Sequence, residues 1–218
     1  MQSYQFLKKD SKKTRSMTPA SHRYFIVNKP YDMHSQFTGV EGRPMLGELD
    51  YPFPEGTHCI GRLDHNSEGL LILTTNKKIT RLLFKSETPH QRTYLLQVYR
   101  KVQPETLQKL EKGVEIRVKD NKLYKTAPCR VKIIDKPENL FQSGWEYPDS
   151  IPHTWLLMTL TEGKFRQIRK MMTVVKHRCL RLIRLSIENL TLDALQPGEV
   201  REISERDFFE KVFGVRVE

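Results

Sequence analysis

Two runs of strand-forming residues around one polar turn constrain the fold of this chain more than any other feature. Residues 58–63 and 70–75 have strand character, and the six residues between them, Asp64 to Gly69, are of types that tolerate tight backbone geometry. The pattern predicts two neighbouring strands with an acid, Asp64, where the first strand ends. Arg62 lies two positions before that acid.

Strand-like and helix-like segments alternate along the rest of the chain. Strands are predicted at residues 24–27, 92–101, 153–161, 180–187 and 199–203, with two more inside 114–134. Helices are predicted at residues 77–84, 104–113, 164–177 and 205–213. A segment rich in Pro, Gly, Asp and Ser, residues 135–152, predicts a loop long enough to be functional. The alternation indicates an α/β (α+β) fold.

Positive charge is concentrated in parts of the sequence. The 37 Lys and Arg residues exceed the 26 Asp and Glu residues, which gives a net charge of +11. Clustered bases displace counterions from a phosphate backbone, so this charge points to a polyanionic partner. Residues 1–22 carry five Lys and Arg against the single acid Asp10, without apolar periodicity. We therefore predict a disordered basic tail before a globular part, residues 23–218.

Several classes of protein do not fit this sequence. The longest clean apolar run, residues 70–73, is far shorter than the roughly 20 residues that span a bilayer. The N-terminus lacks the apolar region of a secretory signal, because Lys8 and Lys9 follow Phe6 and Leu7 directly. Three distant cysteines indicate reduced thiols rather than a disulfide framework. We expect a cytoplasmic protein that does not act on membranes.

The second basic cluster covers residues 162–184, where eight bases stand against one acid. On a helix over residues 164–177, Arg166, Arg169 and Lys170 fall at i, i+3 and i+4 and form one stripe suited to a phosphate backbone. The apolar positions expected to face the core are Phe165, Ile168, Met172 and Val175. A solvated helix face is the alternative for such a stripe. Together with the tail and the net charge, the stripe favours nucleic-acid binding.

Asp64 is the candidate for chemistry. A carboxylate at a strand end beside an arginine is stabilised in its ionised form and can serve as a nucleophile or a base. An Asp that only caps N–H groups of its own turn is the plainer alternative. Asp64 and Glu68 could also be the carboxylate pair of a glycosidase, which lie about 5–10 Å apart. His65 and Glu68 have the spacing of metal ligands but no third ligand, so no metal site is predicted.

Four motifs occur in the order and at the separations found in one enzyme family. They are Asn28-Lys29-Pro30, Gly61-Arg62-Leu63-Asp64-x-x-Ser67-Glu68-Gly69-Leu70-Leu71-x-Leu73-Thr74, Tyr94-Leu95-Leu96-Gln97-Val98 and Glu162-Gly163-Lys164-Phe165-Arg166-Gln167-Ile168-Arg169-Lys170-Met171. On these motifs, residues 23–204 resemble the RsuA/RluB/E/F-type pseudouridine synthases. Tyr31-Asp32 followed by Gln36-Phe37-Thr38 is typical of the E branch of that family.

The resemblance implies a reaction and a role for each residue. The N-glycosidic bond of a uridine breaks, the uracil turns and C5 joins C1′, an isomerisation that needs no cofactor. Asp64 would be the catalytic carboxylate, acting at the ribose by attacking C1′ or by taking the C2′ proton. Tyr94 would stack on the flipped base and help to remove the C5 proton, and Arg169 would pair with Asp64. Arg62 would fill the gap left in the RNA stack.

The resemblance thus implies a monomeric rRNA pseudouridine synthase with a basic active-site cleft. Its catalytic domain, residues 23–218, would have a mixed, largely antiparallel sheet with flanking helices and no S4-like domain before it. The substrate would be 23S rRNA or a large-subunit precursor. The residues expected to bind this RNA are Arg62, Lys29, Lys164, Arg166, Lys170 and Arg184. A non-catalytic rRNA-binding or ribosome-assembly protein is the alternative, but it gives no reason for an Asp turn beside Arg62.

Overall fold

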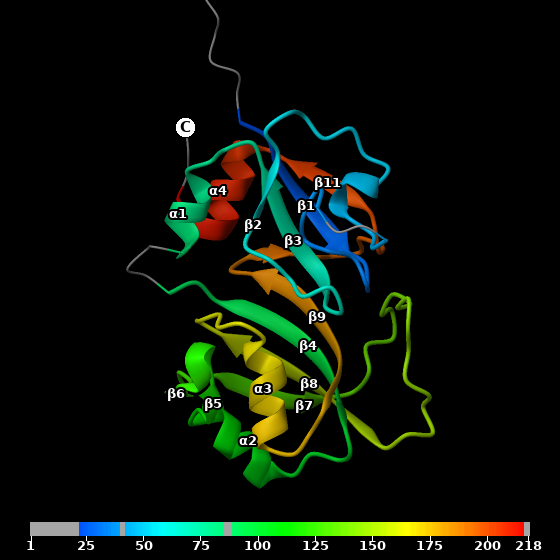
Figure 1. Cartoon of the computed structure of the whole chain (residues 1–218), viewed down its shortest axis with the longest axis vertical. Coiled ribbons are helices and arrows are strands. Elements are labelled where there is room, and N and C mark those ends of the chain that lie inside the picture. Colours follow the sequence, from blue (N-terminus) through cyan, green and yellow to red (C-terminus); the bar gives the residue numbers. More distant parts are fainter. Residues whose placement is uncertain (1–21, 40–41, 85–88, 216–218) are drawn as a thin grey trace, which may run out of the picture.

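The computed structural model describes residues 22–39, 42–84 and 89–215 (Figure 1). The strands are β1 (Tyr24–Lys29), β2 (His58–Ile60), β3 (Glu68–Thr74), β4 (Arg92–Tyr99), β5 (Glu115–Arg117), β6 (Leu123–Lys125), β7 (Arg130–Ile134), β8 (His153–Leu160), β9 (Cys179–Ile187), β10 (Leu190–Thr191) and β11 (Val200–Ile203). The helices are α1 (Ile79–Phe84), α2 (Pro104–Glu111), α3 (Gln167–Val174) and α4 (Glu205–Phe213). The predicted basic tail lies outside the described residues, except for its last residue.

One nine-stranded sheet runs through the molecule in the order β11-β1-β3-β9-β4-β8-β7, with β2 and β10 paired to β3 and β9. Neighbouring strands are antiparallel, except that β3 and β9 run parallel. Strands β5 and β6 form a separate hairpin. The prediction of a mixed, largely antiparallel sheet with flanking helices is confirmed.

The sheet has two halves that meet at β3 and β9. The upper half in Figure 1 holds β1, β2, β3 and β11 with α1 and α4, and the lower half holds β4, β7, β8 and β9 with α2, α3 and the β5–β6 hairpin. Only two residue pairs join β3 to β9, Glu68 with Ile183 and Gly69 with Arg184. The turn that carries Asp64 directly precedes β3, so it lies at this junction.

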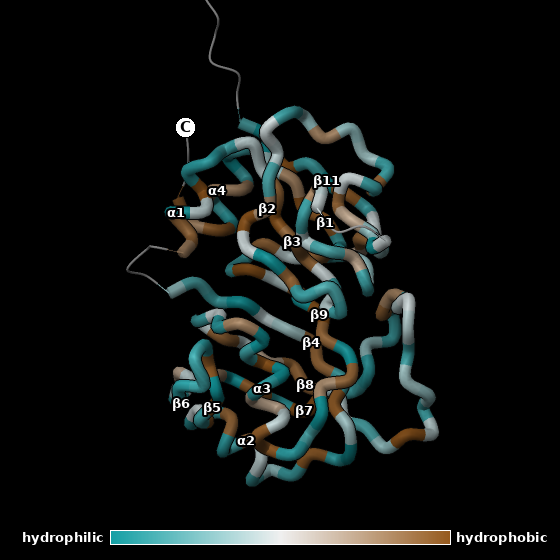
Figure 2. Tube along the Cα trace, viewed as in Figure 1, coloured by the Kyte–Doolittle hydropathy of each residue, from teal (hydrophilic) through white to brown (hydrophobic). Residues whose placement is uncertain are grey.

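Alternation along the strands places apolar side chains on both faces of the upper half. In β1, Tyr24 and Ile26 pack into the cluster that contains α1 and α4, while Phe25 and Val27 pack on the opposite face. In the lower half, α2 and α3 cover one face of the sheet. Figure 2 shows hydrophobic stretches along the strands and hydrophilic ones in the loops between them. These packed layers hold the junction, and thus the Asp64 turn, in place.

Two local predictions were wrong. Residues 114–134 hold three strands rather than two, because Asp120 and Asn121 adopt a positive φ and fold β5 and β6 into a hairpin. Helix α3 begins at Gln167 rather than at residue 164, because Arg166 has left-handed backbone angles, φ 52° and ψ 32°. Phe165 therefore lies outside the helix and is 75% exposed instead of facing the core.

Candidate active site

A cavity of about 290 Å³ opens at the junction of the two halves. Its walls come from the Asp64 turn, from β4 and β9, and from the loop before α3. Six of the nine predicted site residues line it: Asp64, Tyr94, Arg62, Lys164, Arg166 and Arg184. Segments that lie about a hundred positions apart in the sequence thus converge on one small space.

Three groups of hydrogen bonds fix the turn that carries Asp64. The Ser67 N–H donates to the Asp64 carbonyl at 3.0 Å and closes the turn. The Ser35 hydroxyl accepts from the Leu63 N–H at 3.0 Å and donates to the Leu63 carbonyl at 2.9 Å. From the lower half, Arg169 Nη2 donates to the Asn66 carbonyl at 2.7 Å. The carboxylate, 22% exposed, is therefore presented from a rigid support.

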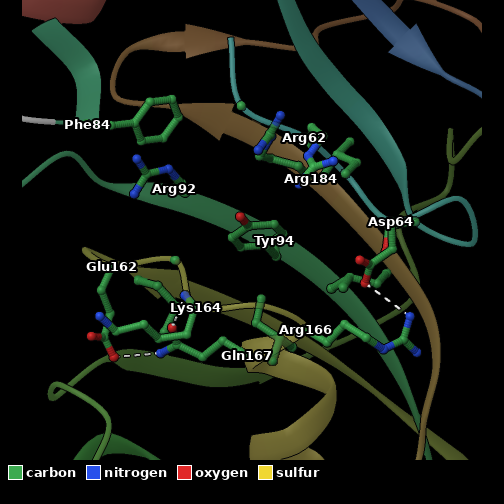
Figure 3. A pocket seen from close by; sticks show the side chains of 17 residues that line it. Arg62, Asp64, Phe84, Arg92, Tyr94, Glu162, Lys164, Arg166, Gln167 and Arg184 are labelled. Carbon is green, nitrogen blue, oxygen red and sulfur yellow. Dashed lines mark hydrogen bonds and ion pairs between the residues drawn. The ribbon is translucent and has the colours of Figure 1, made fainter. Parts of the chain in front are cut away.

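Two arginines of the lower half face the Asp64 carboxylate. Arg166 Nη1 lies 3.4 Å from Oδ2 and Arg169 Nε lies 3.9 Å from the same oxygen. Arg166, expected to contact phosphate, is therefore the nearer partner of Asp64 (Figure 3). Arg169 is the better buried of the two, with 11% exposure against 35%, and its other bonds hold the backbone of the turn. Both guanidinium groups thus lie against the same carboxylate oxygen.

Tyr94 projects from β4 into the middle of the cavity, with Asp64 and Arg166 on one side and Phe84 and Arg92 on the other (Figure 3). The Arg92 guanidinium lies 5.5 Å from the centre of the Phe84 ring. Burial lowers the pKa of Arg92 from its usual value. Arg92 and Phe84 were not predicted as site residues, because nothing in the sequence marks a strand-end arginine as part of a cavity.

Arg184 enters the cavity from β9 and is 4% exposed. Its Nε donates to the Leu70 carbonyl at 2.7 Å across the junction, while its buried Nη2 has no partner among the described residues. Glu162 was also missed, although it is the single acid of the basic segment. It accepts from Gln167 Nε2 at 2.6 Å and so fixes the loop that brings Lys164 to the cavity.

Lys29 was wrongly predicted to bind RNA. Its side chain is fully buried, and Nζ donates to the carbonyls of Pro30, Met33 and His65 at 2.7, 2.7 and 3.1 Å. Burial lowers the pKa of Lys29 to about 7, against the opposing effect of Glu68 and other nearby acids. Lys29 thus ties the loop after β1 to the residue that follows Asp64, and this is a structural role.

Lys170 does not line the cavity either. It lies one position beyond Arg169 on α3, and its Nζ is 5.5 Å from the centre of the Phe165 ring. Lys170 is only half-buried, so RNA contact by this side chain stays a prediction.

Glu68 does not line the cavity, and this argues against Asp64 and Glu68 as the carboxylate pair of a glycosidase. It is 1% exposed and accepts from Arg181 Nε at 2.9 Å and Nη2 at 3.2 Å. A carboxylate held by a buried bidentate arginine cannot reach a substrate beside Asp64. Within the described part of the chain, no three His, Cys, Asp or Glu side chains gather as metal ligands, and no helix is long and apolar enough to cross a membrane.

Comparison with known sequences agrees with this geometry. The model of the RNA pseudouridylate synthase family matches residues 23–173, which contain the Asp64 turn, β4 and nearly all of α3. The chain belongs to the pseudouridine synthase family. The family resemblance expected from the four motifs is confirmed.

Named relatives of this synthase belong to the E branch predicted from its sequence. Ribosomal large subunit pseudouridine synthase E of Vibrio parahaemolyticus is 39% identical over 189 residues, which cover 84% of this chain and 74% of that protein. The protein of the same name from Xanthomonas axonopodis is 35% identical over 174 residues, covering 79% and 89%. A solved structure described as a pseudouridylate synthase shares the fold, with a TM-score of 0.71, 23% identity, and coverage of 88% of this chain and 74% of that one.

Proposed function

We propose that this synthase converts a uridine of large-subunit (23S) rRNA to pseudouridine, with Asp64 as the catalytic carboxylate, acting as a monomer in the cytoplasm. One observation carries the proposal: Asp64 faces a small cavity that also holds Tyr94 and four arginines, Arg62, Arg92, Arg166 and Arg184. The names of the E-type relatives, which refer to the large ribosomal subunit, support the choice of RNA.

The size of the cavity favours a single flipped nucleotide. A volume of about 290 Å³ is near the lower end for small-molecule sites and is far too small for paired RNA. The target uridine therefore leaves its stack, at a cost of a few kcal/mol. Arg62 is exposed at the rim, where its planar guanidinium is suited to occupy the vacated space and recover part of that cost.

Tyr94 acts on the base of the target uridine, and Asp64 acts on its ribose. The ring of Tyr94 offers a stacking surface for the uracil, and Asp64 acts at the ribose by attacking C1′ or by taking the C2′ proton. The N-glycosidic bond breaks and the uracil turns. C5 then bonds to C1′ as Asp64 leaves C1′ or, on the second route, returns the proton to C2′. The proton on C5 is lost with the help of Tyr94, and a proton returns to the freed N1, so the product is an isomer of the substrate. Arg166 and Arg169 face the Asp64 carboxylate and orient it for this step.

The reaction is tested with wild-type protein and unmodified large-subunit rRNA made by transcription. Pseudouridines are mapped in the RNA, and free uracil is measured in the same samples. We expect pseudouridine at a defined position and no free uracil, with RNA affinity that falls steeply as salt is added.

Three other results would contradict the proposal. Release of free uracil would identify an N-glycosidase, in which the base is not rejoined to the ribose. Binding of rRNA without any new pseudouridine would favour the non-catalytic ribosome-assembly protein. Affinity that does not change with salt would overturn the role of the basic residues.

A further inference from the structure

A second cavity of about 450 Å³ lies next to the active-site cavity. Arg166 lines both cavities, and Asn66, two residues after Asp64, lines the second. The described residues around the second cavity are Tyr31, Asn66, Trp145, Tyr147, Arg166, Arg169, Thr173, Arg178, Cys179 and Leu180. Three aromatic rings and three arginines thus face one space next to the reacting carboxylate.

Two of the three rings, Trp145 and Tyr147, come from the long loop, residues 135–152, which leaves the lower half and rises toward the upper half at the edge of the molecule (Figure 1). Trp145 is 49% exposed. Its ring lies nearly parallel to that of Tyr31, with ring centres 6.5 Å apart, and edge-on to Tyr147 at 4.4 Å. An exposed tryptophan beside two tyrosines is a surface suited to stack a flat ring.

Buried contacts fix the loop in this position. Arg181 Nη2 donates to the Phe141 carbonyl at 2.8 Å, and Arg181 Nη1 donates to Glu146 at 3.3 Å. Arg181 is 6% exposed and also holds Glu68, next to the catalytic turn. Because the same arginine anchors the loop and the turn, the aromatic surface has a fixed place relative to Asp64.

The polar groups of the second cavity suit an anionic partner with hydrogen-bond donors. Arg178 is exposed and Arg166 is 35% exposed, so both can meet a phosphate. The Asn66 Oδ1 is buried without a partner among the described residues and can accept from an N–H of a base. An acidic protein segment would use the arginines but would leave the flat aromatic surface unused.

We propose that this second cavity binds the nucleotide next to the target uridine on the same RNA strand. Its base stacks on Trp145 and its phosphate lies against Arg178 and Arg166. The proposal rests on the proposed function. Arg166 lines both cavities, so a nucleotide in the second cavity is the neighbour of the target uridine only if that uridine occupies the active site. The proposal assigns a role in RNA binding to Trp145, which lies outside the four motifs that identify the family.

The test uses tryptophan fluorescence of the full-length protein. The chain has two tryptophans, and the other, Trp155, is only 5% exposed. An oligouridine of about 12 nucleotides should quench the wild-type emission, whereas a sugar-phosphate oligomer of equal length without bases should not. In Trp145→Phe the quenching should vanish while binding persists. Trp145→Ala should bind oligouridine about tenfold more weakly, as expected for the loss of one base–aromatic stack.

Control measurements separate stacking from charge and folding. Leu123→Ala, at a position on β6 that is 64% exposed and away from both cavities, should bind like wild type. The affinity for the oligomer without bases should be equal in wild type and in Trp145→Ala. Equal quenching by both oligomers, no quenching by oligouridine, or tighter binding of polyglutamate than of oligouridine would overturn the proposal.

The outcome is independent of the test of the proposed function. If wild-type protein forms pseudouridine in rRNA but oligouridine does not quench Trp145, the second cavity is not a nucleotide site and the proposed function stands. If oligouridine quenches Trp145 but no pseudouridine forms, the nucleotide site stands and the proposed function falls.

Discussion

The two halves of the sheet bring different kinds of polar side chain to the active site. In the upper half, the groups around the Asp64 turn are buried and hydrogen-bonded, with exposures of 0%, 2% and 1% for Lys29, Ser67 and Glu68. In the lower half, Arg166 is 35% exposed at the start of α3 and faces both Asp64 and the surface. The upper half therefore supplies the acid on a buried support. The lower half supplies Arg169, which also holds the turn, and Arg166, a cation that can also meet RNA.

This difference makes the junction of β3 and β9 the most sensitive part of the molecule. The carboxylate and its arginines come from opposite sides of a junction at which only two residue pairs of β3 and β9 are partners in the sheet. A buried ion pair, Arg181 with Glu68, and the bond from Arg184 to Leu70 reinforce it. Changes at the junction should therefore affect stability and catalysis together, whereas changes on the exposed side of the lower half should affect mainly RNA binding.

The largest loss of stability should follow from breaking the ion pair at the junction. Arg181→Met leaves the buried Glu68 carboxylate without its partner and should lower the free energy of unfolding by about 3–5 kcal/mol. The double variant Glu68→Gln/Arg181→Met should recover most of this loss, as measured by urea unfolding. Arg201→Met, which removes an exposed pair with Asp193, should cost no more than about 1 kcal/mol. Equal effects of the buried and the exposed changes would contradict this account.

The next largest effect is expected at Gly69. This residue has a φ of +98°, and a Cβ there would lie 2.4 Å from the Arg184 carbonyl oxygen and 2.8 Å from its nitrogen. Gly69→Ala should therefore separate β3 from β9 and cost about 2–4 kcal/mol in urea unfolding. Gly163→Ala is the matched control, because its Cβ would meet nothing within 4 Å. A Gly69→Ala protein as stable as the control would show that the close approach is unimportant.

The two arginines that face Asp64 should differ in their effect on catalysis. Arg169→Gln removes a charge and the hold on the turn, so kcat should fall roughly 100-fold, whereas Arg166→Gln removes a more exposed charge and should lower kcat roughly tenfold. Arg206→Gln, at an exposed position on α4, serves as the control. Single-turnover rates on rRNA would measure the difference, and a larger loss for Arg166→Gln would reverse the assignment.

The smallest effect is a pH dependence at Lys29. Its pKa of about 7 in the folded protein lies below the usual 10.5, so between these values the unfolded chain binds more protons and stability rises with pH. From pH 7 to pH 8 this contribution is at most roughly 1 kcal/mol. Lys29→Met should lose this rise in urea unfolding, while the exposed Lys112→Met should keep it. The same pH slope in all three proteins would contradict the burial argument.

Much of the fold could be predicted from local sequence pattern. Alternation marked β4, strand-forming residues marked β1, and Pro104 marked the start of α2, because these signals depend on neighbours in the chain. The pairing of β3 with β9 could not be predicted, since it depends on contacts between residues more than a hundred positions apart. The start of α3 was missed because the left-handed backbone of Arg166 leaves no mark in composition.

The sequence predicted which residues carry the chemistry of the site better than it predicted how those residues are buried and paired. The motifs pointed to Asp64, Tyr94 and Arg62, and all three line the cavity. Lys29 was assigned to RNA because a lysine in a motif next to proline has no feature that reveals burial. Glu162 was missed for a related reason, because its partner Gln167 is the first residue of α3 and the contact forms only once the loop between them folds.

The role of Asp64 is tested most directly by the rate of pseudouridine formation in Asp64→Asn. The variant keeps the shape of the side chain but cannot act as a nucleophile or base at the ribose. With unmodified large-subunit rRNA in single-turnover reactions, we expect no pseudouridine from Asp64→Asn, rRNA affinity close to that of wild type, and normal activity from the exposed Asp50→Asn. Pseudouridine formation by Asp64→Asn at the wild-type rate would show that the reacting carboxylate is elsewhere.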